Sequence, residues 1–168
     1  MATIKQHFDA DAAQFRSATA FPQYVKVDGT NAPVTGLAYD ASTEETSYLR
    51  MRAINYGSGN WTVNLNWYAD TASSGGVSWG VSVAAITPNT DTQDVETKAF
   101  ATETIVSDTH LGTTGQRSHD VVGTLSNLDS VAADDLVLIR VARKPADAGD
   151  TMSGDAILTM VDISYSDT

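Results

Sequence analysis

One pentapeptide in this chain matches the motif that surrounds the nucleophile of many hydrolases. Residues 76–80 are Gly-Val-Ser-Trp-Gly, a G-x-S-x-G pattern in which a serine on a sharp strand-to-helix turn attacks a carbonyl carbon. Here the alternation of residue types continues through Val81, Val83 and Ala85, which keeps the chain extended past Ser78. The segment therefore predicts a half-buried strand, and we expect no catalytic residue and no enzymatic activity.

Histidines and acidic residues are the other groups that could do chemistry, as metal ligands. His7, His110 and His119 show neither H-x-x-x-H nor H-E-x-x-H spacing, the spacings by which helical histidines bind zinc. Two acidic clusters offer carboxylates, one with Asp91, Asp94 and Glu96, the other with Asp147, Asp150 and Asp155. Neither follows the D-x-D-x-D-G spacing of a calcium loop with its closing glutamate. We predict acidic surface loops without a metal or cofactor, and calcium binding is the alternative.

Aromatic side chains suggest a third kind of chemistry, the stacking of sugar rings on a flat apolar surface. Trp67 shares the phase of Val63 and Leu65, and Trp79 shares that of the valines around it. Both tryptophans should therefore point into the core. Tyr68 is out of phase with them and should face solvent, so glycan binding remains an alternative function.

The composition and charge of the chain exclude several classes of protein. It has 168 residues and no cysteine, so neither disulfides nor cysteine-ligated metals are available. Twenty-one acidic residues against ten basic ones give a net charge of −11, which disfavours nucleic acid and anionic membranes as partners. The first residues are charged where a signal peptide is apolar, and purely apolar stretches such as residues 83–86 are too short to cross a membrane. We therefore expect a protein made and folded in a cytoplasm.

Segments of alternating character recur from residue 34 to the end of the chain, with turn-forming residues between them. Such alternation is typical of strands with one buried face. The predicted strands are residues 34–39, 46–56, 61–69, 77–86, 100–106, 117–125, 136–143 and 156–165. Eight strands of this length favour an all-β, antiparallel, jelly-roll-like β-sandwich, with a closed barrel as the alternative. The expected core is Val63, Leu65, Trp67, Val77, Trp79, Val81, Val83, Val137, Ile139, Val141, Ile157, Val161 and Ile163.

The first 30 residues differ from the rest and predict an N-terminal arm or short helix, with the sandwich domain at residues 31–168. Ile4, Phe8 and Phe15 recur at roughly helical spacing in a polar, alanine-rich segment that ends at Phe21-Pro22. A helix this short is marginal in water, so these side chains need a surface to pack on. That surface is the chain's own sandwich in one interpretation. In the other, Ile4, Phe8 and Phe15 contact a neighbouring protein.

Four stretches combine strand alternation with characteristic turns. They are Leu37-Ala-Tyr-Asp-Ala-Ser-Thr-Glu-Glu-Thr, Trp61-Thr-Val-Asn-Leu-Asn-Trp-Tyr-Ala, Ser73-Ser-Gly-Gly-Val-Ser-Trp-Gly-Val and Asp147-Ala-Gly-Asp-Thr-Met-Ser-Gly-Asp-Ala. Together they resemble a family of bacteriophage structural proteins built on jelly-roll modules. The resemblance covers residues 37–165 and leaves out the arm.

The resemblance implies a non-enzymatic virion protein of the capsid-decoration or head-fibre type, located in the virion. It also implies partners, namely further copies of the chain in a homotrimer and the major capsid protein or other virion proteins. Symmetric repetition would then sum weak contacts into durable attachment. The alternative function is a carbohydrate-binding β-sandwich, in which solvent-facing aromatic residues lie beside polar groups.

Overall fold

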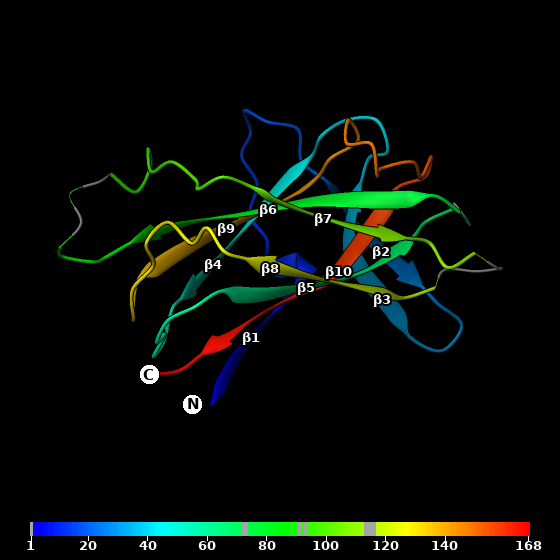
Figure 1. The fold of residues 1–168 in the computed structure, drawn as a ribbon. Helices are drawn as coiled ribbons and strands as arrows, with labels where there is room; N and C mark the ends of the chain where they lie inside the picture. The colour runs from blue at the N-terminus through cyan, green and yellow to red at the C-terminus, as the bar shows by residue number, and fades with distance from the viewer. Residues whose placement is uncertain (1, 72–73, 91, 93, 113–116) are drawn as a thin grey trace.

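Two antiparallel sheets lie face to face in the computed structural model, which describes residues 2–71, 74–90, 92, 94–112 and 117–168 (Figure 1). Ser73 and Asp91, which belong to motifs named above, lie outside these residues. The described strands form two separate sheets rather than a closed barrel. The protein is therefore a jelly-roll-like β-sandwich, as the alternation predicts.

The first sheet has the strand order β2-β3-β10-β5-β8, and β1 pairs with β10 as well. Its strands are β1 (Thr3–Asp9), β2 (Gln23–Asp28), β3 (Pro33–Tyr39), β5 (Trp61–Ala69), β8 (His119–Leu125) and β10 (Ala156–Ser166). The second sheet has the order β4-β9-β6-β7, with β4 (Thr46–Arg52), β6 (Gly76–Ile86), β7 (Thr104–Thr109) and β9 (Leu136–Arg143). Among the described residues, no helix is long and apolar enough to cross a membrane.

The predicted alternation places the core residues correctly, with one exception in β10. Val63, Leu65 and Trp67 of β5 are fully buried, and all the other expected core residues are buried as well. Ile157, however, lies outside the main core cluster, which Leu158 joins instead. A β-bulge between Leu158 and Met160 causes this change, because an extra residue exchanges the two faces of a strand.

Strand β6 is buried on both faces along its whole length, so the prediction of a half-buried strand is wrong for this segment. The connection between β6 and β7 covers its outer face at Gly80, and the loop after β9 covers it at Gly76 and Ser78. Ala101 donates its N–H to the Val83 carbonyl at 2.8 Å, and the Glu103 carboxylate lies over Gly80, where a Cβ would come within 2.4 Å of it. The small residues of the Gly-Val-Ser-Trp-Gly segment thus make room for this cover.

The amino-terminal segment is a strand where the spacing predicts a helix. Residues 3–9 form β1, which pairs antiparallel with β10 and aligns Ile4 with Tyr165 and Phe8 with Val161. A spacing of four residues places two side chains on one face of a helix, but also on one face of a strand. The spacing of Ile4 and Phe8 therefore did not distinguish the two structures.

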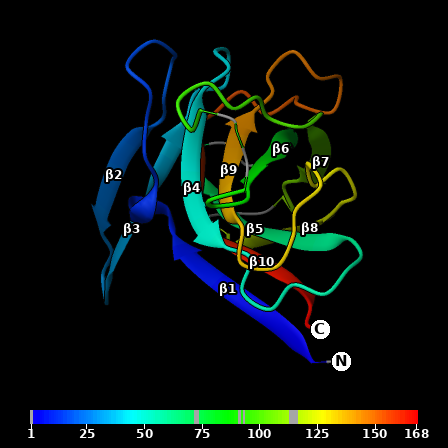
Figure 2. The ribbon, with the colours of Figure 1, turned by 90° about the vertical axis from the view of Figure 1, so that its left-hand side faces the viewer.

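Residues 10–30 add a second unexpected strand. After a short 3₁₀ turn at Ala10–Ala12, the chain forms β2, which pairs with β3 so that Val27 lies opposite Val34. The first 30 residues thus contribute two strands to the first sheet, in place of an arm or helix. Figure 2 shows β1 along one edge of the molecule and the β2–β3 pair at one side.

Candidate ligand-binding groove

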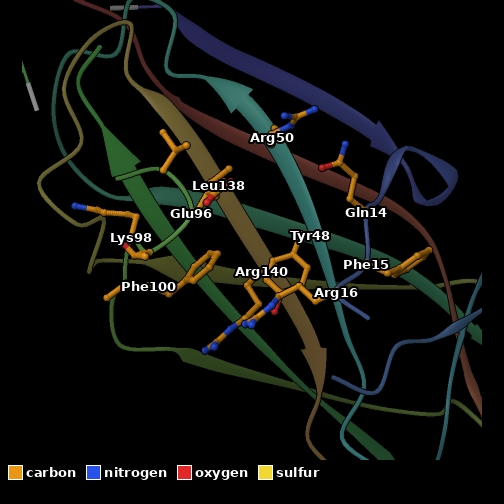
Figure 3. A pocket seen from close by; sticks show the side chains of 13 residues that line it. Gln14, Phe15, Arg16, Tyr48, Arg50, Glu96, Lys98, Phe100, Leu138 and Arg140 are labelled. Carbon is orange, nitrogen blue, oxygen red and sulfur yellow. The ribbon is translucent and has the colours of Figure 1, made fainter. Parts of the chain in front are cut away.

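A groove lies on the outer face of the second sheet, over β4 and β9. We call it the β4–β9 groove. It has a volume of about 550 Å³, and its lining consists of Gln14, Phe15, Arg16, Tyr48, Arg50, residues 95–100, Leu138 and Arg140 (Figure 3). Its floor follows from the register of the sheet, because Tyr48 lies opposite Arg140 and Arg50 lies opposite Leu138. Paired residues point to the same face, so these four side chains form one surface.

Two irregular segments make the walls of the groove. On the β4 side, Gln14 exchanges two backbone hydrogen bonds with Tyr48, at 2.8 and 2.9 Å. On the other side, residues 95–100 are held by the bond from Ala101 to Val83 and by the ion pair between Lys98 and Asp129, whose atoms are 3.0 Å apart. The walls therefore come from two loops that are far apart in sequence and fixed to the same sheet.

Aromatic and guanidinium groups meet at the centre of the groove. The rings of Tyr48 and Phe100 are 5.9 Å apart between centroids, inclined at 49°. The Arg140 guanidinium lies over the Phe100 ring at 5.3 Å from its centroid, a cation–π arrangement. In Figure 3, Lys98 and Phe100 lie on one side of the cavity and Phe15 on the other, with Tyr48 between them. The groove thus offers ring faces with hydrogen-bond donors beside them.

Positive charge dominates the lining of the groove. Arg16, Arg50, Lys98 and Arg140 line it against one carboxylate, that of Glu96. Glu103 does not line the groove, but it neutralises part of this charge, because its carboxylate is 3.3 Å from Arg140. The same carboxylate is 3.1 Å from Lys144. Burial lowers the pKa of Lys144, but its hydrogen bonds to Glu44 and Glu103 outweigh that effect and raise the pKa above its ordinary value.

A second hollow, of about 490 Å³, lies on the outer face of the first sheet, and we call it the opposite-face hollow. Its lining consists of Val27, Gly29, Val34, Asn66, Tyr68, Asp70, Ser118, Thr159 and Met160. Tyr68 points outward here, so the phase prediction for this residue is confirmed. Burial, with the Asp70 carboxylate nearby, raises the pKa of Tyr68. The lining of this hollow combines the apolar side chains of Val27, Val34 and Met160 with the polar ones of Asn66, Asp70, Ser118 and Thr159.

The remaining candidate residues have structural roles. Ser78 is buried in the middle of β6, where its hydroxyl donates to Asp147 at 2.8 Å and contacts Ser107. The strand prediction is therefore confirmed for the G-x-S-x-G segment. Asp150 forms a buried ion pair with Arg143. Among the described residues, no group of three or more histidine or acidic side chains is placed to hold a metal ion.

The histidines also lie apart from the groove. His119 stacks on Trp67 at 4.4 Å between ring centroids, and His110 packs against His119 at 4.7 Å. Both histidines are buried beside Trp67. His7 lies on β1, 2.7 Å from Asp162.

The three residues expected to contact a neighbouring protein do not form one surface. Ile4 and Phe8 pack against the protein's own core, which agrees with the interpretation of an arm on its own sandwich. Phe15 is 40% exposed, stacks on Phe21 at 5.4 Å and lines the β4–β9 groove. A contact of these residues with another chain stays a prediction.

Sequence reasoning missed the residues that form the groove. Tyr48 and Arg140 occupy the outward phase of β4 and β9, between buried residues such as Leu49 and Ile139. Tyr48 is an aromatic residue in the outward phase of its strand, which is the pattern that singled out Tyr68. Phe100 lies in a connection and comes to Tyr48 only through the tertiary structure, so its role had no local signature.

Comparisons with known proteins support the fold. No protein-family model matches the sequence, and no curated protein sequence matches it. Among solved structures, a carbohydrate-binding module of Cellvibrio mixtus lichenase 5A in complex with cellotriose aligns over 96% of this chain and 97% of that one. The identity is 11% and the TM-score is 0.51.

Two further structures align at lower scores. The chain matches 26% of the Clostridium thermocellum xylanase 10B CBM22-1 and GH10 modules complexed with xylohexaose, with 93% of this chain covered, 11% identity and a TM-score of 0.48. A family 11 module of Clostridium thermocellum in complex with a mixed-linked tetrasaccharide aligns over 95% of this chain and 87% of that one, with 9% identity and a TM-score of 0.44.

Proposed function

We propose that this protein is a non-enzymatic carbohydrate-binding domain that holds a glycan in the β4–β9 groove. The observation that carries the proposal is the cluster of Tyr48, Phe100 and Arg140 in a groove walled on both sides. A groove of this volume accommodates a short oligosaccharide segment.

The chemistry of the groove suits a sugar. The C–H face of a sugar ring is apolar and packs on an aromatic face, while its hydroxyls need hydrogen-bond partners. Tyr48 and Phe100 supply the faces. Arg140, Arg50 and Gln14 supply donors at the edge, and Glu96 supplies an acceptor. The similarity to the Cellvibrio mixtus module supports the sandwich alone, and the ligand is inferred from these side chains.

Replacing Tyr48 with alanine should abolish most of the glycan affinity. Removal of a ring at the centre of a binding surface costs at least about 1.4 kcal/mol, roughly tenfold in Kd. The measurement is a glycan array on the full chain, followed by calorimetric titration of the best ligand with parent and variant. Tyr48 is only partly buried, so the variant should keep its fold, which a thermal melt checks.

Tyr68→Ala is the matched control, because it also removes a tyrosine ring, but from the opposite-face hollow. It should leave the affinity within about twofold of the parent, since it does not touch the groove. Loss of binding in Tyr68→Ala with full binding in Tyr48→Ala would move the site to the first sheet. An array without any bound glycan would contradict the proposed function.

A virion structural role is the second candidate, and the outer face of the first sheet favours it. Val27, Val34, Met160 and Val122 are all substantially exposed there, and the first three line the opposite-face hollow. Contiguous exposed apolar side chains mark surfaces that bind other proteins. In this candidate function the sheet face forms the symmetric contact of a homo-oligomer on a virus particle.

Met160→Glu should break such an oligomer into monomers, because it buries a charge in the apolar contact. Analytical ultracentrifugation of parent and variant, with co-sedimentation on particles, measures the effect. Ile54→Glu is the control, since Ile54 is 49% exposed in the connection after β4, away from this face. A parent chain that is monomeric at all concentrations and does not sediment with particles would contradict this role.

A further inference from the structure

The distribution of cations over the molecule is uneven, and the β4–β9 groove holds a large share of them. The chain carries only ten lysines and arginines and a net charge of −11. Arg16, Arg50, Lys98 and Arg140 nevertheless line one groove together with the single carboxylate of Glu96. In an acidic protein this arrangement produces a local positive field surrounded by negative surface.

Two of these cations already have partners, and two are available to a ligand. Lys98 pairs with Asp129 at 3.0 Å and Arg140 pairs with Glu103 at 3.3 Å. Arg16 and Arg50 make no ion pair within 4.0 Å in the part of the chain that the structure describes. Arg50 projects from the sheet and Arg16 from the wall beside β4, so they approach the groove from different elements.

We infer that the β4–β9 groove binds an acidic polysaccharide and that Arg16 and Arg50 hold uronate carboxylates of its sugars. This inference rests on the proposed glycan-binding function and names the class of glycan. The planar guanidinium group donates two parallel hydrogen bonds to a carboxylate, a geometry that lysine cannot supply. Arg16 and Arg50 therefore fit carboxylate recognition, while Tyr48 and Phe100 offer ring faces to the sugars.

The ring faces in the groove favour a uronic-acid polysaccharide over a ligand that binds through charge alone. A uronic-acid polymer also presents ring faces and neutral hydroxyls to the aromatic residues, which a purely electrostatic ligand does not use. The groove, with ring faces at its centre, matches the former ligand.

The test titrates the full-length chain with polygalacturonate and with the same polymer after reduction of its carboxyls to alcohols. The parent should bind the acidic polymer about tenfold more tightly at low salt, and added salt should weaken this binding as exposed charges are screened. Arg50→Gln should lose about tenfold toward polygalacturonate and less than about twofold toward the reduced polymer.

Arg52→Gln is the matched control. It changes the net charge equally and lies two residues along the same strand, but outside the groove, where its guanidinium donates to the Asp134 carbonyl at 2.7 Å. It should bind both polymers within about twofold of the parent. Equal losses in Arg50→Gln and Arg52→Gln would overturn the inference, because the effect would then follow net charge alone.

Dextran sulfate and a single-stranded oligonucleotide complete the experiment. Binding of either as tight as that of polygalacturonate would overturn carboxylate recognition, in favour of sulfate esters in the first case and of general polyanion binding in the second. Equal affinity for polygalacturonate and for its reduced, neutral form, lost in Tyr48→Ala, would overturn the acidic ligand but keep the proposed function. Absence of binding to both polymers and to every glycan of the array would contradict the proposed function itself.

Discussion

Arg143→Ala should lower the free energy of unfolding by about 3–5 kcal/mol, because it leaves a buried carboxylate without its partner. The Arg143 side chain is fully buried and the Asp150 side chain is 1% exposed. Two hydrogen bonds join them, from Nε at 3.0 Å and from Nη2 at 2.9 Å. Without the guanidinium, the carboxylate keeps the hydrogen bond from the Ser78 N–H at 3.1 Å, which compensates only in part for its lost hydration.

The arginine also holds three backbone carbonyls that belong to different parts of the chain. Nη1 donates to the carbonyls of Tyr39 and Gly154, at 3.2 and 2.8 Å, and Nη2 donates to that of Met152 at 2.7 Å. These bonds fasten the loop after β9 to the end of β3. Loss of the side chain would therefore leave several buried acceptors unpaired.

Urea denaturation followed by circular dichroism measures this prediction. Arg117→Ala is the control, because Arg117 is exposed and its loss should change the free energy by less than about 0.5 kcal/mol. The double variant Arg143→Met with Asp150→Leu removes both charges and should recover the part of the loss that comes from the unpaired carboxylate, while the three carbonyls stay without their donor. A loss below about 1 kcal/mol in Arg143→Ala would show that the buried ion pair does not stabilise the loop.

Trp79→Ala should cost about 3–5 kcal/mol of unfolding free energy, the range for removing a large aromatic side chain from a core. Trp79 is fully buried in β6 and packs edge-on against Tyr39, with ring centroids 5.1 Å apart. Its Nε1 atom makes no hydrogen bond in the described part of the structure. The stabilisation therefore comes from packing.

Trp79→Phe separates the contribution of packing from the cost of the buried, unpaired N–H. It keeps a ring in the core and removes the unpaired N–H, so it should cost less than Trp79→Ala by at least about 1.5 kcal/mol. Both variants are measured by urea denaturation. An alanine variant as stable as the parent would show that the inward face of β6 is assigned to the wrong phase.

These two predictions are coupled, because Trp79 and Arg143 lie opposite each other in the register of β6 and β9. Paired residues share a face, so Arg143 sits on the core side of β9 in line with Val137, Ile139 and Val141. Their free-energy losses should therefore not add in the double variant, as neighbours in contact affect one another.

The strand phases could be predicted from the sequence, since each depends on a local period of two. Val63, Leu65 and Trp67 were assigned to the core on this ground, and the structure buries all three. The same pattern places Tyr68 outward. A strand that must present one face to a core carries this information in its own residues, so it can be predicted without knowledge of its partners.

The prediction from sequence failed for segments whose local pattern fits two structures. Ile4 and Phe8 are four residues apart, which suits a helix as well as a strand, and only the free edge of β10 decides for the strand. Likewise, nothing within β6 shows that the connection after it and the loop after β9 cover its outer face, although Gly76 and Gly80 leave the space. Pairing with a distant segment determined both outcomes.

The candidate site depended on tertiary structure to a greater degree. Alternation alone gives the outward phase of Tyr48 and Arg140, but their alignment comes from the register of β4 and β9. Phe100 and Arg16 join them from two connections that have no regular pattern. The sequence by itself determined which faces of the strands are apolar, because burial selects residue types locally. Only the tertiary structure decided which outward residues meet in a groove, because strand register and loop path depend on contacts between distant residues.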